Sequence, residues 1–264
     1  MTKASDKKKT TASQPQASSI LPLFYKRPVP LDKKAHANAS LASDLSFNFA
    51  SNVNAVPVTM IELPDIMQFY PIAFSSDKPA TPLAILGLRA NENLFVNEKG
   101  QWMQGTYIPA YIRRYPFIFA RNDAGDRLTL CVDDAPGVLT KGDKNPLFDK
   151  EGEMGALTKS ALDFCRSYQA AADQTQEFSN ALEAANILID RHAEVRMQDG
   201  SALTLSGFRQ VDEKKYYELP EATILEWHKR GWTRFIYAHI LSTGSWQRLF
   251  ALMEARSTTG GKKK

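Results

Sequence analysis

The chain has 264 residues, of which 43% are hydrophobic and 23% are charged, an ordinary composition for a globular protein that is long enough for one large domain. The formal net charge is +4, but residues 1–19 and residues 257–264 each carry a net +3, which leaves −2 for residues 20–256. Because a domain that binds nucleic acid carries positive charge on its folded surface, we expect no nucleic-acid partner.

The two ends of the chain combine lysine with small polar residues and show no apolar periodicity. They predict disordered basic tails, 1–19 and 257–264, around one folded domain, 20–256. No stretch is apolar over the roughly 18 residues of a membrane span, and no apolar run follows the N-terminal lysines as in a Sec signal peptide. We expect a soluble cytoplasmic protein, with the cell surface, reached by another export route, as the alternative.

The first part of the chain favours extended structure. Pro22, Pro28 and Pro30 disfavour a helix and are typical of an edge segment. Alternation over residues 45–49 predicts a short strand. Further along, Cys131 and Cys165 both lie in apolar segments, so we expect them to be reduced and buried.

A P-x5-Y-P-x2-F pattern occurs at residues 64–74 and again at residues 109–119. The first proline of each copy suits the start of a helix, and the second proline ends it. The pattern predicts that residues 56–88 and 101–133 are two strand–helix–strand–strand units that share one sheet. A chance match between two short aromatic turns is the alternative.

The second half of the chain contains a long loop and then helices. Residues 133–155 are rich in Gly, Pro and Asp, which is typical of a lid or a domain junction. The apolar stripe over residues 156–190 predicts either a helical hairpin, with Asp173 or Thr175 as the second cap, or one bent long helix.

The remaining elements follow from turn and cap signals. An Asp-Gly turn at residues 199–200 predicts a hairpin of strands 193–196 and 202–205, followed by a strand at 207–212. A helix should run from Pro220 to Gly231. The apolar run 232–241 predicts a buried central strand, and residues 246–253 predict a closing helix. The fold class is therefore α+β, a single domain with a mixed, mostly antiparallel sheet, a strand–helix–strand duplication and a helical insertion.

Several segments together resemble the SapC family of bacterial surface-layer-associated proteins, over roughly residues 22–253. The resemblance implies a soluble, non-enzymatic accessory or binding protein with a link to the cell-surface layer, because no established activity comes with the family. A peptide-transporter permease shares the name, but the chain has no stretch that could span a bilayer. The resembling segments are 25–31 (YKRPVPL), 82–88 (PLAILGL), 93–95, 100–102, 107–117 (YIPAYIRRYPF), 207–208, 211–213, 219–220 and 237–242 (YAHILS).

The densest mixture of aromatic, proline and arginine residues is residues 102–119. Neighbouring helical residues point about 100° apart, so Arg113 and Arg114 should serve different faces. We expect one of them to pair with Asp133 or Asp134 and the other to hold a ligand carboxylate or phosphate. Arg114 is the expected ligand-facing residue, since Arg113 can lie over Phe117. The candidate ligand-binding residues are Trp102, Tyr107, Tyr111, Arg113, Arg114, Tyr115 and Asp133.

Three alternatives remain open at this stage. The same segment can be a packed aromatic core edge with salt bridges, or a surface for a protein partner rather than for a small anionic ligand. An enzyme acting on an anionic small molecule, beside Arg113 and Arg114 and under the loop 133–155, is the alternative function; its catalytic residues are not identifiable. We expect no metal and no cofactor, because the histidines (His36, His192, His228 and His239) lack ligand spacing and no phosphate-binding glycine motif occurs.

Overall fold

The computed structural model describes residues 21–121, 127–142, 144–196 and 202–260. The predicted tail 1–19 and the last four residues of the predicted tail 257–264 lie outside these ranges. The closing helix is longer than residues 246–253, because helix α7 extends from Ser245 to Gly260.

The described strands form three antiparallel sheets, so the α+β class is confirmed and the expected single shared sheet is wrong. The five-stranded sheet has the order β3-β5-β4-β10-β9, the three-stranded sheet β1-β7-β6, and the two-stranded sheet β2-β8. The strands are β1 (Pro28–Pro30), β2 (Ala39–Leu41), β3 (Ala55–Pro57), β4 (Ile72–Ser75), β5 (Pro82–Ile85), β6 (Phe117–Arg121), β7 (Leu128–Asp133), β8 (Leu139–Lys141), β9 (Leu188–Arg196) and β10 (Ala202–Val211).

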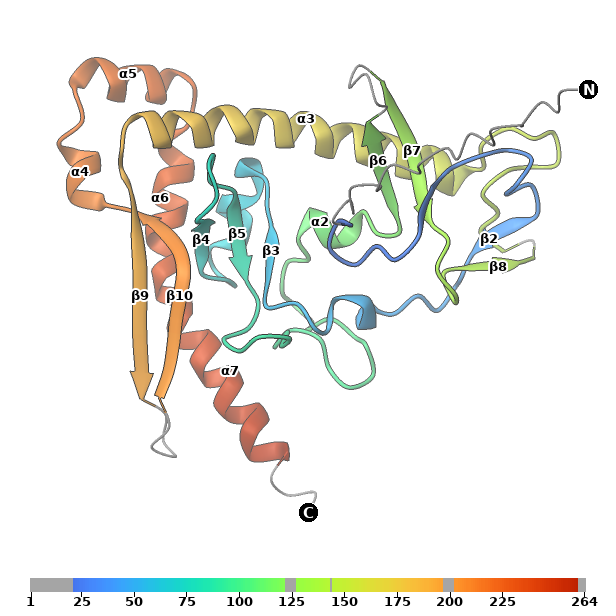
Figure 1. Cartoon of the computed structure of the whole chain (residues 1–264), viewed down its shortest axis with the longest axis horizontal. Coiled ribbons are helices and arrows are strands. Elements are labelled where there is room, and N and C mark those ends of the chain that lie inside the picture. The colour runs from blue at the N-terminus through green and yellow to red at the C-terminus, as the bar shows by residue number, and fades with distance from the viewer. Residues whose placement is uncertain (1–20, 122–126, 143, 197–201, 261–264) are drawn as a thin grey trace, which may run out of the picture.

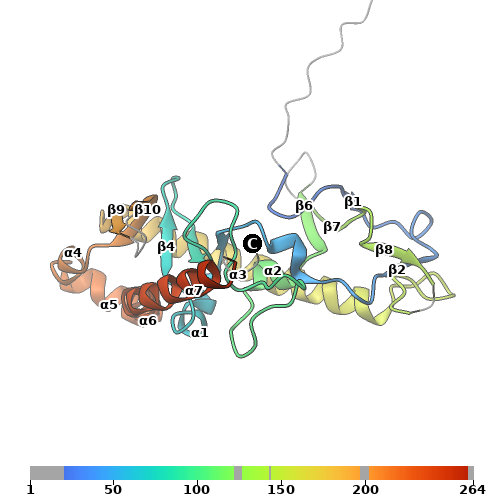
Figure 2. The same cartoon turned by 90° about the horizontal axis from the view of Figure 1, so that it is seen from below.

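Most helices lie around the five-stranded sheet, and the longest one, α3, crosses nearly the whole molecule (Figure 1). The α-helices are α1 (Leu63–Ile66), α2 (Ala110–Arg113), α3 (Ala156–Ala184), α4 (Glu213–Tyr217), α5 (Glu221–Lys229), α6 (Thr233–Leu241) and α7 (Ser245–Gly260), and the 3-10 helices are η1 (Phe47–Ala50), η2 (Met60–Glu62) and η3 (Ser242–Gly244). Helix α7 follows α6 directly through η3 (Figure 1), and α1 packs against α6; all three helices lie on the same side of the molecule in the view from below (Figure 2).

Helix α3 is one continuous helix of 29 residues, about 44 Å long. The second cap expected at Asp173 or Thr175 is not used, because the Thr175 hydroxyl donates to the Ala171 carbonyl at 2.6 Å, one turn back. The same oxygen accepts the Met60 backbone N–H at 2.8 Å. The residue that suggested a helix start therefore ties the middle of α3 to η2.

Two hydrophobic cores lie along α3. The larger core holds the five-stranded sheet and α6, and α3 contributes Phe178 and Leu182 to it. The smaller core lies under the three-stranded sheet, and α3 contributes Cys165 to it from its first half. Helix α3 thus packs on both cores, and its middle lies between the five-stranded and the three-stranded sheet (Figure 1).

The predicted repeat is partly present. A one-turn helix followed by an antiparallel hairpin recurs, as α1 with β4 and β5 and as α2 with β6 and β7. The first strand does not recur, because Trp102 forms an isolated bridge with Val96 instead of joining β7. The proline-rich β1 pairs with β7 in its place, at the edge of the sheet, as expected for Pro28 and Pro30.

Two predicted strands are helical. Residues 233–241 form α6, with Trp232 as its N-cap; Phe235, Ile236 and His239 are buried while Tyr237 and Leu241 are exposed. This is the spacing of a helix. Because the exposed positions are also apolar, the sequence shows a continuous apolar run instead of a helical period. The strand expected at residues 45–49 is replaced by η1, at whose start the Ser46 hydroxyl accepts the Asn48 N–H.

The hairpin and the helix after Pro220 are confirmed, with shifted ends. Strands β9 and β10 are longer than predicted, and the strand expected at residues 207–212 continues β10 after an irregularity between Leu205 and Phe208. Helix α5 ends at Gly231, which has a φ of +69° and donates to the His228 carbonyl, while Trp232 donates to the Trp227 carbonyl. These two bonds are the C-terminal cap that the glycine predicted.

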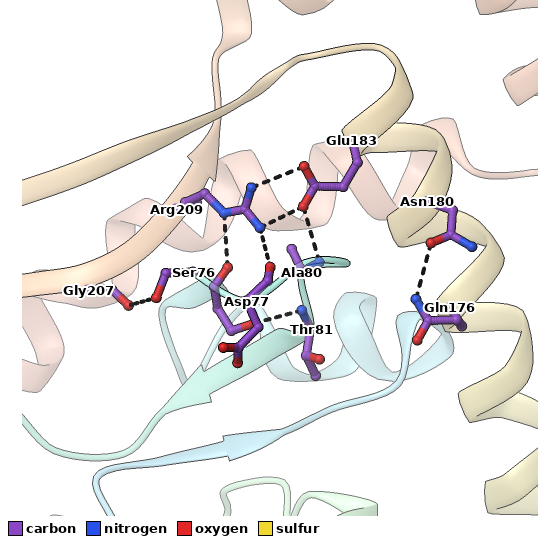
Figure 3. A network of polar contacts seen from close by, with 10 residues as sticks. Ser76, Asp77, Ala80, Thr81, Gln176, Asn180, Glu183, Gly207 and Arg209 are labelled. Carbon is purple, nitrogen blue, oxygen red and sulfur yellow. Dashed lines mark hydrogen bonds and ion pairs between the residues drawn. The ribbon is translucent and has the colours of Figure 1, made fainter.

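A buried ion pair fixes the hairpin to the rest of the fold (Figure 3). The Arg209 guanidinium on β10 meets the Glu183 carboxylate at the end of α3 at 2.6 Å and 3.1 Å. The same guanidinium donates to the carbonyls of Ser75 and Asp77, and Glu183 accepts the Ala80 N–H at 3.2 Å. The network therefore joins α3, β10 and the β4–β5 turn at one point.

Candidate functional site

A small pocket lies where α2 meets the middle of α3, and it has a volume of about 190 Å³. Helix α2 faces α3 in both views of the molecule (Figures 1 and 2). The pocket is lined by Thr59, Ile61, Glu62, Asp65, Tyr107, Ala110, Arg113, Phe164, Ser167, Tyr168 and Ala171. Two predicted site residues, Tyr107 and Arg113, thus come together with residues of η2, α1 and α3 that the sequence did not single out.

Arg113 is exposed but held in a fixed orientation. Its Nε donates to the Ile108 carbonyl at 2.9 Å, and its Nη2 donates to the Tyr107 hydroxyl at 2.9 Å. The guanidinium carbon lies 5.3 Å from the centre of the Tyr107 ring and 5.2 Å from that of Phe164. The predicted contact with Phe117 is therefore replaced by contacts with two other rings. One edge of the guanidinium is used, and within the described residues the edge between Nη1 and Nη2 has no hydrogen-bond partner.

Glu62 is the buried carboxylate of the pocket, with 4% of its surface exposed. One oxygen accepts from the Ala110 N–H at 2.7 Å and the Tyr107 hydroxyl at 3.1 Å. The other accepts from the N–H and the hydroxyl of Thr59, at 2.9 Å and 2.8 Å. These four bonds saturate the carboxylate and position Tyr107, which in turn holds Arg113. The T-x-x-E spacing of Thr59 and Glu62, a capping-box signature, is the sequence signal that identifies this residue.

The environment of Tyr107 keeps its phenol protonated. Burial, and then the charge of Glu62, raise the pKa of Tyr107 to about 12, although Arg113 opposes this. The hydroxyl therefore donates to Glu62 and accepts from Arg113 at neutral pH. Tyr107 therefore links the fixed Glu62 carboxylate to the Arg113 guanidinium through two hydrogen bonds.

Arg114 has different surroundings. Its guanidinium carbon lies 4.1 Å from the ring centre of Tyr111, 4.6 Å from that of Tyr168 and 5.9 Å from that of Tyr25. Its Nε is buried and has no hydrogen-bond partner within the described residues. Burial raises the pKa of Tyr25 and of Tyr168 even though Arg114 acts in the opposite direction. Arg114 is thus a cation enclosed by neutral tyrosines.

The expected ion pair between an arginine of α2 and Asp133 or Asp134 is not formed. Asp133 is fully buried and accepts the Arg27 N–H at 2.6 Å and the Tyr115 hydroxyl at 2.9 Å. Asp134 pairs with the side chain of Arg27 at 2.8 Å. Asp133 therefore holds the N-terminal segment against β7. The aspartates lie at the start of β1 rather than beside α2.

The other predicted site residues lie outside the small pocket. Trp102 is buried in the larger core, where its Nε1 donates to the Thr106 hydroxyl at 3.0 Å. Tyr111 is buried against Phe24 and Tyr168. The Tyr115 ring stacks on Phe49, with ring centres 4.1 Å apart. These residues form the packed aromatic edge that was the alternative to a site.

The loop 133–155 is not placed as a lid over Arg113. None of its described residues lines the small pocket. Residues 135–138 instead border another hollow, of about 330 Å³, beside Tyr115. Strand β8 within the loop pairs with β2. The enzyme alternative therefore gains no support from this loop as a lid over the pocket.

A larger hollow, of about 760 Å³, lies between α3 and α5. Its cation, Arg230, is paired with Glu226 at 3.2 Å and with Glu177 at 3.9 Å. Arg113 has no such ion pair among the described residues. The guanidinium of the smaller pocket is therefore the more available of the two for an anionic ligand. In the same described ranges, no three His, Cys, Asp or Glu side chains are placed to hold a metal ion.

Comparison with known proteins gives one match. Neither the curated proteins nor the solved structures match the chain. Among the helices of the described segments, none has the length and apolar character to cross a membrane. The family model of SapC matches residues 31–249, which is most of the chain. The chain therefore belongs to the SapC family.

Proposed function

We propose that this SapC-family chain is a non-enzymatic accessory or binding protein that holds the carboxylate of a small ligand, or of a partner, at Arg113. The observation that carries the proposal is the open Nη1–Nη2 edge of a guanidinium whose other edge is fixed by Ile108 and Tyr107. Two parallel N–H donors match the two oxygens of a carboxylate. The link to the cell-surface layer is supported by the family alone.

The fixed position of Arg113 supports binding energetically. A free arginine side chain loses up to about 2 kcal/mol of rotamer entropy when it is ordered. Contacts with Tyr107 and Phe164 order this one before a ligand arrives. A hydrogen bond to a charged group then contributes about 1.5–3 kcal/mol, so a small carboxylate should bind measurably.

The state of Glu62 favours binding over catalysis. A general base needs a lone pair that faces the substrate. Glu62 already accepts four hydrogen bonds from Thr59, Tyr107 and Ala110. It supports the position of Arg113 and has little capacity left to take a proton from a ligand. We therefore place the enzymatic alternative second.

The test is titration of the protein with 4-methylpentanoate, followed by calorimetry, for the wild type and three arginine variants. Arg113→Met should weaken binding at least about tenfold, a loss of 1.4 kcal/mol, and leave stability nearly unchanged. Arg114→Met should retain binding but lower the free energy of unfolding by about 1–2 kcal/mol, the value of a desolvated cation–π contact. Arg121→Met, at the exposed end of β6, controls for the loss of one positive charge.

Two results contradict the proposal. One is the absence of saturable binding to the wild type at millimolar 4-methylpentanoate. The other is equal binding by the wild type and Arg113→Met, which places the carboxylate elsewhere. If 4-methylpentanol, the uncharged analogue, binds as tightly as the acid, the pocket recognises only the apolar part of the ligand and not its carboxylate.

A further inference from the structure

We propose that the ligand is an amino acid with an apolar side chain, which presents its ammonium group to Asp65 and its carboxylate to Arg113. This inference rests on the proposed function of Arg113 and adds a second charge to it. The structure places the two residues on the lining of the same pocket of about 190 Å³. Their opposite charges select a ligand that carries both an anion and a cation.

Asp65 is available for a cationic group. It is exposed in the first turn of α1, after Pro64. In the described part of the chain, its carboxylate has neither a hydrogen bond nor an ion pair. Glu62, the other carboxylate of the pocket, is saturated and buried. Asp65 is therefore the acid of this pocket that can receive an ammonium group.

The remaining lining sets the character and the size of the rest of the ligand. Phe164, Tyr168 and Ala171 of α3 form one wall, and Ile61 of η2 also lines the pocket. These surfaces favour an apolar group. A volume of about 190 Å³ is below the roughly 300 Å³ at which pockets for drug-sized ligands begin. The space suits one side chain rather than a large ligand.

These features define one orientation of the ligand. The charged head group lies at the exposed residues Arg113 and Asp65, and the apolar side chain enters between Ile61 and the α3 wall. A peptide C-terminus offers the carboxylate without an adjacent ammonium group, and a peptide N-terminus offers the reverse. A free amino acid carries both groups on one carbon atom, so the proposed class is a free aliphatic amino acid.

The test compares L-leucine with its two singly blocked forms, by calorimetry on the full chain. N-acetyl-L-leucine lacks the ammonium group and L-leucinamide lacks the carboxylate. We expect L-leucine to bind best, and each blocked form to bind at least about fivefold more weakly. Asp65→Asn should reduce the affinity for L-leucine by a similar factor and leave that for N-acetyl-L-leucine unchanged. Asp163→Asn, an exposed acid on α3, is the matched control and should change neither affinity.

The outcomes separate this inference from the function on which it rests. If N-acetyl-L-leucine binds as tightly as L-leucine, and Asp65→Asn has no effect, the ammonium contact is wrong while carboxylate binding at Arg113 stands. If L-leucinamide is the tightest ligand, or if none of the three compounds binds, both the inference and the proposed function are overturned. Circular dichroism of Asp65→Asn shows whether a loss of binding comes from unfolding.

Discussion

Arg113, the last residue of α2, and Arg114, its C-cap, are adjacent and chemically identical, yet they lie in different surroundings. Arg113 keeps an open edge beside a pocket, whereas Arg114 is enclosed by Tyr25, Tyr111 and Tyr168. The angle between neighbouring helical residues predicted that they would separate. It did not indicate which one faces a ligand, because this depends on aromatic residues of α3. We therefore propose Arg113, instead of the Arg114 expected from the sequence, as the ligand-facing residue, and a packing role for Arg114.

A second residue-scale feature is His239, which is buried on α6. Its Nε2 accepts the Val211 backbone N–H at 3.1 Å, so the ring is neutral. Burial lowers the pKa of His239 from 6.5 to about 4. Below pH 6.5 the unfolded chain binds the proton and the folded chain does not. The free energy of unfolding should therefore fall as the pH decreases from 6.5 to 4 and level off below that.

This leads to a measurable difference between the wild type and His239→Gln, which keeps an acceptor but does not titrate in this range. Between pH 7 and pH 4.5, urea unfolding should show that the wild type loses about 2–3 kcal/mol more than the variant. Carboxylates affect both proteins equally, so the difference isolates the histidine. Parallel pH profiles for the two proteins would mean that His239 is protonated in the folded state.

At the scale of elements, the sequence predicts what is locally encoded. Proline and glycine signals correctly placed the edge strand β1, the one-turn helices, and the end of α5 at Gly231. Predictions failed where tertiary contacts decide. Apolar residues at the exposed positions of α6 left no visible helical period in its sequence. Thr175 accepts a hydrogen bond from η2 instead of capping a second helix.

The ion pair between Arg209 and Glu183 gives an element-scale prediction, because it joins α3, β10 and the β4–β5 turn (Figure 3). Glu183→Gln leaves the Arg209 guanidinium buried without a counter-charge. We expect the free energy of unfolding, measured in urea, to decrease by about 3 kcal/mol. The hydrogen bond from Arg209 lowers the pKa of Glu183, so this stabilisation should also be lost as the pH falls through that lowered pKa.

A matched change on the same helix provides the control. Glu177 is exposed and reaches Arg230 only at 3.9 Å. Glu177→Gln should change stability by less than about 1 kcal/mol. Equal losses for the two variants would show that the buried pair does not hold the three elements together.

At the scale of the whole molecule, α3 spans two cores, and the pocket lies at its middle (Figure 1). The pocket combines η2, α1, the segment around residues 107–110, α2 and α3. The sequence identified Tyr107 and Arg113 by their density of aromatic and charged neighbours. It could not identify Phe164 and Tyr168, since they belong to an ordinary apolar stripe until α3 is placed against α2. The proposed site therefore forms only when segments that are distant in the sequence pack together.

The most direct test of this account is a crystal structure of the protein grown with saturating L-leucine. The account predicts a carboxylate on the Nη1–Nη2 edge of Arg113, with both N···O distances near 2.8 Å, and an apolar side chain against Phe164 and Tyr168. Density for L-leucine at another place, or an Arg113 side chain turned away from Tyr107 and paired with Asp65, would contradict it.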